Sequence, residues 1–129
     1  MMRRYFIVLL LPLLFSFQCE DDDLSGFETS YMIQNNTNST LFYLNAESRL
    51  VEIAQQSSLL IRSDLNNETL PIPPSENIEL SSIQLYKNVA SDFILSYEQT
   101  PIDDAFWAFE ETSENRFEYT LELTESLLD

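Results

Sequence analysis

The strictest constraint on the fold is an alternation of side chains near the end of the chain. From residue 116 to residue 124 every second residue is apolar, namely Phe117, Tyr119, Leu121 and Leu123. Successive side chains of a β-strand point to opposite faces of its sheet, so this spacing predicts a strand with one buried and one solvated face. A helix would instead need apolar residues three or four positions apart. We therefore expect a sheet that covers a core with one of its faces.

Shorter runs of strand-forming residues recur through the chain, separated by Asn, Ser and Pro. We expect further strands at 29–33, 41–44, 50–53, 59–62, 83–86 and 93–97. The run from Leu41 to Leu44 is apolar on both faces, which is typical of a central strand covered on each side. About 110 residues with short strands at such intervals predict an all-β fold, a small antiparallel β-sandwich of seven or eight strands, immunoglobulin-like in the general sense.

Three segments of the chain need separate interpretation. Residues 50–54 also fit one face of a helical turn, which Ser48 could cap, so that strand has a helical alternative. The segment from Ser63 to Ser75 contains three prolines, which lack the backbone donor that a sheet needs, and we expect a long loop there. The segment from Pro101 to Asp104 is typical of a turn.

The first residues of the chain have the composition of a secretory signal. Arg3 and Arg4 precede a largely apolar run of 13 residues, from Tyr5 to Phe17. A membrane-spanning helix needs roughly 20 apolar residues, and Pro12 disfavours a permanent span. Residues 1–18 are therefore expected to be a cleaved signal peptide, which directs the remainder out of the cytoplasm.

The only cysteine follows this run directly and resembles the lipobox cysteine of bacterial lipoproteins. Ser16 and Gln18 make it a loose form of the box, and Cys19 with the acidic residues after it resembles the start of mature lipoproteins of the Bacteroidota type. The resemblance covers about the first 23 residues, which comprise the signal and the region around its cleavage site. It implies that Cys19 is acylated and becomes the new N-terminus, which accounts for an unpaired cysteine in an exported chain.

The acidic run after the cysteine resembles a signal for display on the outer face of the outer membrane. It consists of Glu20, Asp21, Asp22 and Asp23. The resemblance implies a cell-envelope location, lipid-anchored in the outer membrane and exposed at the cell surface. The expected organisation is a signal peptide at 1–18, a lipidated acidic tether at 19–27 and a β-sandwich domain at 28–129.

The charge of the exported part restricts its partners. All 22 acidic residues lie at or after Glu20, and only four of the six basic residues follow Cys19, which leaves a net charge of −18. Such a domain repels phosphate backbones, so nucleic acid is excluded as a partner. It also repels an anionic bilayer, so we expect membrane contact through the lipid anchor alone.

Several classes of chemistry lack their residues in this chain. Without histidine, and with its only cysteine assigned to the anchor, the chain cannot build Ser-His-Asp or Cys-His nucleophiles or the usual zinc and copper sites. Gly26 is the only glycine, so a glycine-rich phosphate cradle is excluded. The carboxylate pairs Asp103-Asp104 and Glu110-Glu111 lack the spacing of a calcium loop. We expect no cofactor and no metal.

Trp107 is the remaining candidate for ligand contact. It could stack on a sugar ring or on a partner's side chain, but a small domain without disulfides favours its burial in the core. The resulting hypothesis is a non-enzymatic lipoprotein that binds a protein or glycan partner, or joins an envelope assembly, through one face of a sandwich. The alternatives are a small envelope enzyme or inhibitor and a carbohydrate-binding module that uses exposed aromatic residues.

Overall fold

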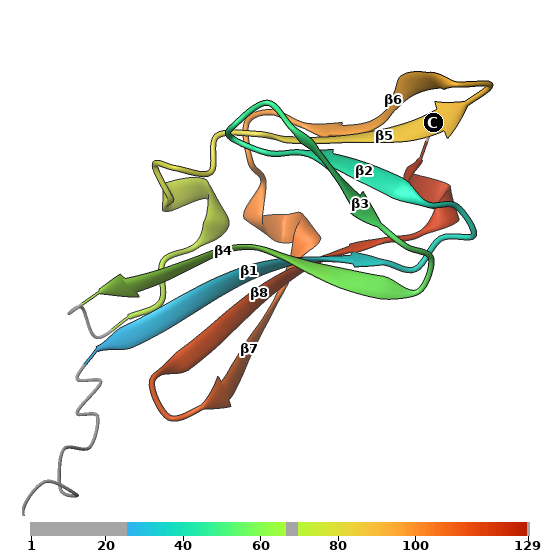
Figure 1. The fold of residues 1–129 in the computed structure, drawn as a ribbon. Coiled ribbons are helices and arrows are strands. Elements are labelled where there is room, and N and C mark those ends of the chain that lie inside the picture. Colours follow the sequence, from blue (N-terminus) through green and yellow to red (C-terminus); the bar gives the residue numbers. More distant parts are fainter. Residues whose placement is uncertain (1–25, 67–69, 129) are drawn as a thin grey trace, which may run out of the picture.

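The computed structural model describes residues 26–66 and 70–128, which form two β-sheets packed face to face (Figure 1). The expected all-β sandwich is confirmed. The described residues contain three single-turn 3-10 helices, η1 (Pro74–Glu76), η2 (Asp104–Phe106) and η3 (Glu125–Leu127). The strands are β1 (Phe27–Asn35), β2 (Leu41–Leu44), β3 (Leu50–Ile53), β4 (Ser57–Asn66), β5 (Ile83–Val89), β6 (Asp92–Gln99), β7 (Trp107–Ser113) and β8 (Arg116–Leu123).

Each sheet has four strands. The first sheet has the order β4-β1-β8-β7, and the second sheet has the order β3-β2-β5-β6. Strands β1 and β8 run parallel, from the pair Glu28 and Arg116 to the pair Asn35 and Leu123, whereas the other described pairs are antiparallel. The last strand of the chain therefore lies between β1 and β7 and holds the first sheet together.

The core lies between the two sheets and draws on both. On β8, Leu121 and Leu123 are fully buried and Glu122 between them is exposed, as the alternation predicts. Within residues 26–66 and 70–128, no helix combines the length and apolar character required to cross a membrane. The buried apolar residues are Tyr31, Ile33, Leu41, Tyr43, Ile53, Leu80, Ile83, Leu85, Ile102, Trp107, Leu121 and Leu123.

The helical alternative for residues 50–54 is wrong, because residues 50–53 pair with β2. A tight turn brings the two strands together: Oδ1 of Asn45 accepts hydrogen bonds from the backbone N–H of Glu47 at 3.0 Å and of Arg49 at 2.9 Å. Ser48 lies within this turn at φ 61° and caps no helix. Local turn chemistry and strand pairing together outweigh the helical spacing.

The proline-rich loop begins later than expected. Ser63 to Asn66 continue β4, where they pair with β1 from Ser30 back to Phe27. This part of the expected loop contains no proline, so each of its residues keeps the backbone donor that a sheet uses.

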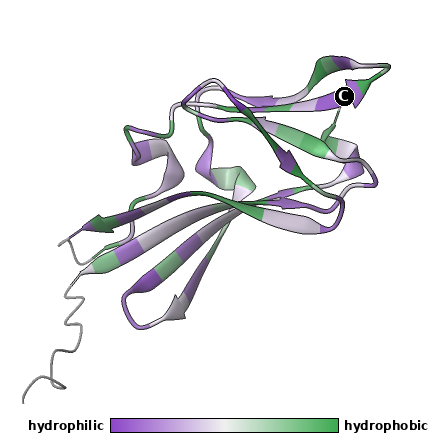
Figure 2. Ribbon diagram, viewed as in Figure 1, coloured by the Kyte–Doolittle hydropathy of each residue, from purple (hydrophilic) through white to green (hydrophobic). Residues whose placement is uncertain are grey.

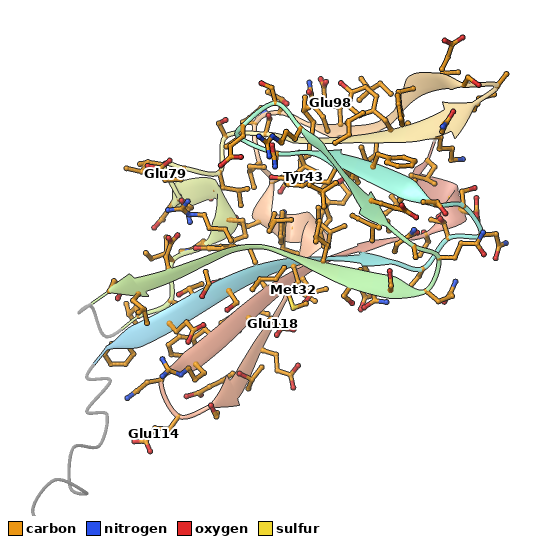
Figure 3. The ribbon with its side chains drawn as sticks, viewed as in Figure 1. Met32, Tyr43, Glu79, Glu98, Glu114 and Glu118 are labelled. Carbon is orange, nitrogen blue, oxygen red and sulfur yellow. The ribbon has the colours of Figure 1, made fainter. Side chains whose placement is uncertain are left out.

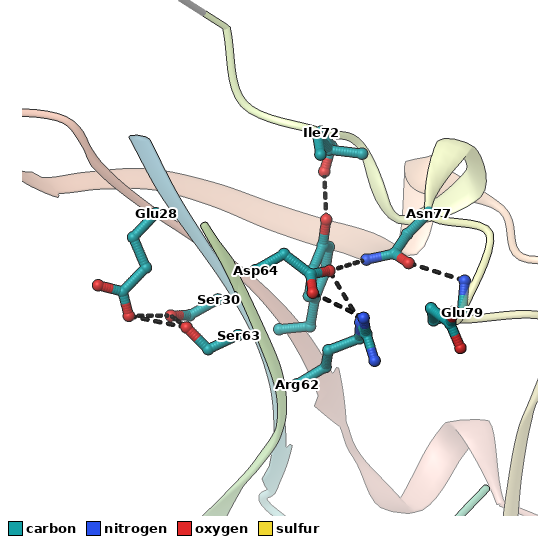
Figure 4. Close-up of polar contacts among 9 residues, drawn as sticks. Glu28, Ser30, Arg62, Ser63, Asp64, Ile72, Asn77 and Glu79 are labelled. Carbon is teal, nitrogen blue, oxygen red and sulfur yellow. Dashed lines mark hydrogen bonds and ion pairs between the residues drawn. The ribbon is translucent and has the colours of Figure 1, made fainter. Parts of the chain in front are cut away.

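The loop after β4 is held on the first sheet by polar contacts (Figure 4). The hydroxyl of Tyr31 donates a hydrogen bond of 2.7 Å to the carbonyl oxygen of Ile72. The amide of Asn77 donates one of 2.5 Å to Asp64, which also forms an ion pair of 2.7 Å with Arg62. These contacts bring the 3-10 turn η1 against the core, where Pro74 is buried.

Candidate functional site

The residues proposed for anchoring and export lie outside the described part of the chain. These are Cys19, Glu20, Asp21, Asp22 and Asp23. Trp107 lies within it and is 6% exposed, so its predicted burial is confirmed. Because the surrounding core covers the ring, Trp107 has no open face on which a ligand could stack in this structure.

The outer face of the second sheet carries apolar side chains. Strand β2 was expected to be covered on both faces, but only its inner residues Leu41 and Tyr43 are buried. Phe42 points the other way and is only partly buried. No described strand or helix lies over this face, so the expected second cover is not supplied by these residues (Figure 1).

Four residues on this face form a surface that we call the outer patch: Phe42, Tyr86, Phe93 and Leu95. Strand pairing places them on one side of the sheet, with Tyr86 opposite both Phe42 and Leu95. The rings of Phe42 and Phe93 meet edge to face, with centroids 5.0 Å apart and an interplanar angle of 77°. Phe93 is 47% exposed and Leu95 is 41% exposed, so much of this apolar area contacts water.

A hollow of about 470 Å³ adjoins the outer patch. Phe42 belongs to both, and the hollow also contains one acidic and one basic side chain, Glu52 and Lys87. Polar groups beside an apolar surface orient a bound partner, whereas the apolar groups provide most of the affinity. The lining residues are Ser39, Thr40, Phe42, Glu52, Lys87, Asn88 and Val89.

The opposite side of the sandwich has a different chemistry. On the outer face of the first sheet, Ser30 lies opposite Glu118 and Gln34 lies opposite Glu122. Figure 3 shows Glu118 projecting away from the sandwich, whereas Tyr43 lies between the sheets. Figure 2 shows apolar residues on β2 and on the β5–β6 hairpin. The outer face of the first sheet is mainly polar and acidic, although Met32 and the half-exposed Leu60 also lie on it. The outer face of the second sheet is partly apolar.

A second group of aromatic rings lies on the inner face of the first sheet and extends outward from the core residue Tyr31. Tyr31 stacks on Tyr119 at 6.0 Å, and Phe109 contacts Tyr119 at 5.0 Å and Phe117 at 6.0 Å. Phe109, on the edge strand β7, is 52% exposed. These rings therefore cover part of one another within the domain.

Acidic side chains do not gather into a metal site in the described residues, where no group of three or more candidate ligands occurs. The hollow contains a single carboxylate, that of Glu52. General acid–base chemistry by paired carboxylates needs two of them around one substrate. The arrangement beside the outer patch is therefore suited to binding through apolar contact.

Family models, curated proteins and solved structures were compared with this chain, and none of them matches it.

The outer patch was not identified from the sequence, although its signal is present. Residues 41–44 are apolar on both faces, and 93–95 are three consecutive apolar residues. Such runs fit a strand covered on each side by its own chain. They fit equally a strand whose second cover is another molecule, and only the arrangement of the sheets distinguishes the two.

Proposed function

We propose that this chain is an exported lipoprotein of the bacterial envelope, anchored through Cys19, whose sandwich binds a partner protein through the outer patch. The proposed role is non-enzymatic and needs no cofactor. The observation that carries it is the partial exposure of Phe42, Phe93 and Leu95 together on one face of an otherwise acidic domain. Contiguous exposed apolar groups on a small domain mark interaction sites.

The position of the patch suits a tethered domain. After the proposed cleavage before Cys19, seven residues, from Cys19 to Ser25, would precede the described part, and a chain of that length spans at most about 25 Å. The tether leads into β1 of the first sheet, whereas the outer patch lies on the second sheet. A partner can therefore reach the patch without displacing the strand that carries the anchor.

A protein partner suits the patch better than a sugar. Platforms for sugar rings present an aromatic face to the ligand, but the edge-to-face contact of Phe42 with Phe93 uses part of one ring face. Leu95 adds an aliphatic side chain that offers only dispersion and hydrophobic contact. Aromatic and aliphatic groups packed in this way resemble the apolar centre of protein interfaces.

Photocrosslinking in intact cells tests the proposal face by face. A photoreactive phenylalanine is placed at Phe93 on the second sheet, or at Glu118 on the polar face of the first. We expect a discrete adduct of larger mass from position 93, lost when Phe42→Ser is added, and no such adduct from position 118. Equal adducts from both positions, or none from position 93, would contradict the proposal.

A further inference from the structure

Strand β6 forms one edge of the second sheet and differs from the other sheet edges in its side chains. From Phe93 to Tyr97 it carries no charge, and Ile94 is 50% exposed between the patch residues Phe93 and Leu95. Proteins usually protect a sheet edge with charged residues, bulges or short strands. An uncharged apolar edge is therefore a site where a further strand can pair.

The other three edges carry such protection. Strand β3 has four residues, β4 carries Arg62 and Asp64, and β7 carries Glu110 and Glu111 with a register shift next to them. In β6 the register also shifts, at Ser96, but the residues on either side remain extended. Edge strand β4 also exposes Leu60 and Leu65, but Arg62 and Asp64 lie between them. In β6 three consecutive apolar residues are exposed along a free edge with no charged residue among them.

The charges around β6 indicate the chemistry of the added strand. Asp92 and Glu98 lie at the two ends of the uncharged run, and Figure 3 shows Glu98 on the outer face. Opposite charges on neighbouring strands attract, and like charges directly opposite each other repel. A second copy of the exported chain, with a net charge of −18, would bring its own acidic surface against the same edge.

The partner is thus an extended segment of a different protein. We infer that this segment adds to the free edge of β6 as a strand, with apolar side chains beside Phe93 and Leu95 and basic residues opposite Asp92 and Glu98. This inference rests on the proposed binding role of the outer patch and specifies how that patch is used. Main-chain hydrogen bonds would supply affinity, and the alternate side chains would supply specificity.

The register of β5 fixes the length of a suitable probe. Six residues of β5, from Gln84 to Val89, lie opposite the seven residues of β6 from Asp92 to Glu98. A hexapeptide with the sequence Lys-Thr-Val-Thr-Val-Lys has as many residues as this β5 segment. We align it antiparallel to β6, in the same register as β5. Its lysines then lie opposite Asp92 and Glu98, and its valines lie beside Phe93 and Leu95 on the outer face.

Binding of this peptide to the full-length protein, purified in detergent, is followed by amide chemical shifts. We expect shifts centred on β6, and affinity at least about tenfold lower for Phe93→Ala, since central aromatic residues dominate such interfaces. The pair Asp92→Asn and Glu98→Gln should weaken binding more than the matched pair Glu118→Gln and Glu122→Gln. The charge-reversed peptide Glu-Thr-Val-Thr-Val-Glu should not bind.

Two proline-containing peptides test whether the peptide binds as a β-strand, because proline cannot donate a backbone hydrogen bond. An added strand donates to β6 from alternate residues, so Lys-Pro-Val-Pro-Val-Lys or Lys-Thr-Pro-Thr-Pro-Lys should lose at least about tenfold in affinity. If both bind as tightly as the parent, strand addition is wrong, while a Phe93 adduct in cells would leave the proposed function intact. Absence of peptide binding, or a concentration-dependent dimer formed through β6, would also overturn the inference.

Discussion

The indole Nε1–H of Trp107 donates a hydrogen bond of 2.9 Å to Oε1 of Gln99. Trp107 begins β7 in the first sheet and Gln99 ends β6 in the second, so the bond joins the two layers. The same oxygen accepts a bond of 3.0 Å from the backbone N–H of Asp103, and the Gln99 amide donates one of 2.9 Å to the hydroxyl of Tyr97. Gln99 thereby satisfies several polar groups at the end of the core.

Replacing Trp107 should destabilise the domain strongly. Trp107→Ala is expected to lower the free energy of unfolding by about 3–5 kcal/mol, as for other large-to-small core changes. Gln99→Leu should cost about 1–3 kcal/mol for each buried donor that it leaves unpaired. Urea titration measures both. An unchanged stability in Trp107→Ala, combined with lost partner binding, would instead make Trp107 a binding residue.

Asn35 is a buried polar side chain on which the turn after β1 depends. Its amide donates to the carbonyl oxygens of Ser39 and Ile53 at 2.8 and 3.0 Å, and its Oδ1 accepts from the backbone and hydroxyl of Thr37. Asn35→Ala should therefore cost about 3 kcal/mol or more in urea titration. The exposed neighbour Asn36 is the control, because Asn36→Ala should change stability by less than about 0.5 kcal/mol. Similar losses for the two variants would refute this role.

Buried and partly buried tyrosines should make the domain less stable at alkaline pH. Burial raises the pKa of Tyr31, Tyr43, Tyr97 and Tyr119 above the usual value. The folded chain therefore keeps these phenols protonated where the unfolded chain loses the protons, so the stabilisation is complete below about pH 10 and declines as pH rises above it. Urea titrations from pH 8 to 11 should show this decline. Tyr31→Phe should be less stable at pH 8, but its free energy of unfolding should decline less steeply with rising pH. An equal slope in the variant and the wild type would show that Tyr31 does not contribute to the pH dependence.

The outer patch should contribute little to folding. Phe93→Ser is expected to change the free energy of unfolding by about 1 kcal/mol or less, because it removes a half-exposed ring and one aromatic contact. The core variant Leu85→Ala, on the neighbouring strand, should cost about 2–5 kcal/mol. Comparable losses in the two variants would show that the patch is structural, and its proposed role in binding would lose support.

Strands were predictable where periodicity and turn residues agreed. The alternation from Phe117 to Leu123 predicted β8, and the expected strands at 83–86 and 93–97 lie inside β5 and β6. Strand β7 was not predicted, because its alternation is short: Glu111 stands where the next residue on the face of Trp107 and Phe109 should be apolar, and the register shifts beside it. Irregular edge strands take their conformation from the neighbouring strand, which local sequence does not encode.

The sheet order and the candidate site required the structure. The parallel pairing of β1 with β8 joins segments at opposite ends of the chain, and no local pattern specifies such a contact. Residues Leu41 to Leu44 are apolar on both faces, which indicated a central strand, and β2 is a central strand of its sheet. It could not indicate whether the cover over Phe42 belongs to this chain or to a partner, because the apolar pattern is the same in both cases.

The acidic run should act separately from the anchor. Replacing Glu20, Asp21, Asp22 and Asp23 with alanine should preserve lipid attachment but leave the domain facing the periplasm. Protease added to intact cells should then degrade the wild-type domain and spare the variant. A variant that stays accessible to the protease would refute the surface signal while leaving the anchor untouched.

The most direct test of the central claim is lipid labelling at Cys19. Cells grown with a labelled fatty acid should incorporate the label into the wild-type protein, which should fractionate with membranes. Cys19→Ala should lose the label and remain as uncleaved precursor or as protein released from the membrane. If Cys19→Ala protein still carries the label, the anchor is elsewhere and the proposed lipoprotein assignment through Cys19 is wrong.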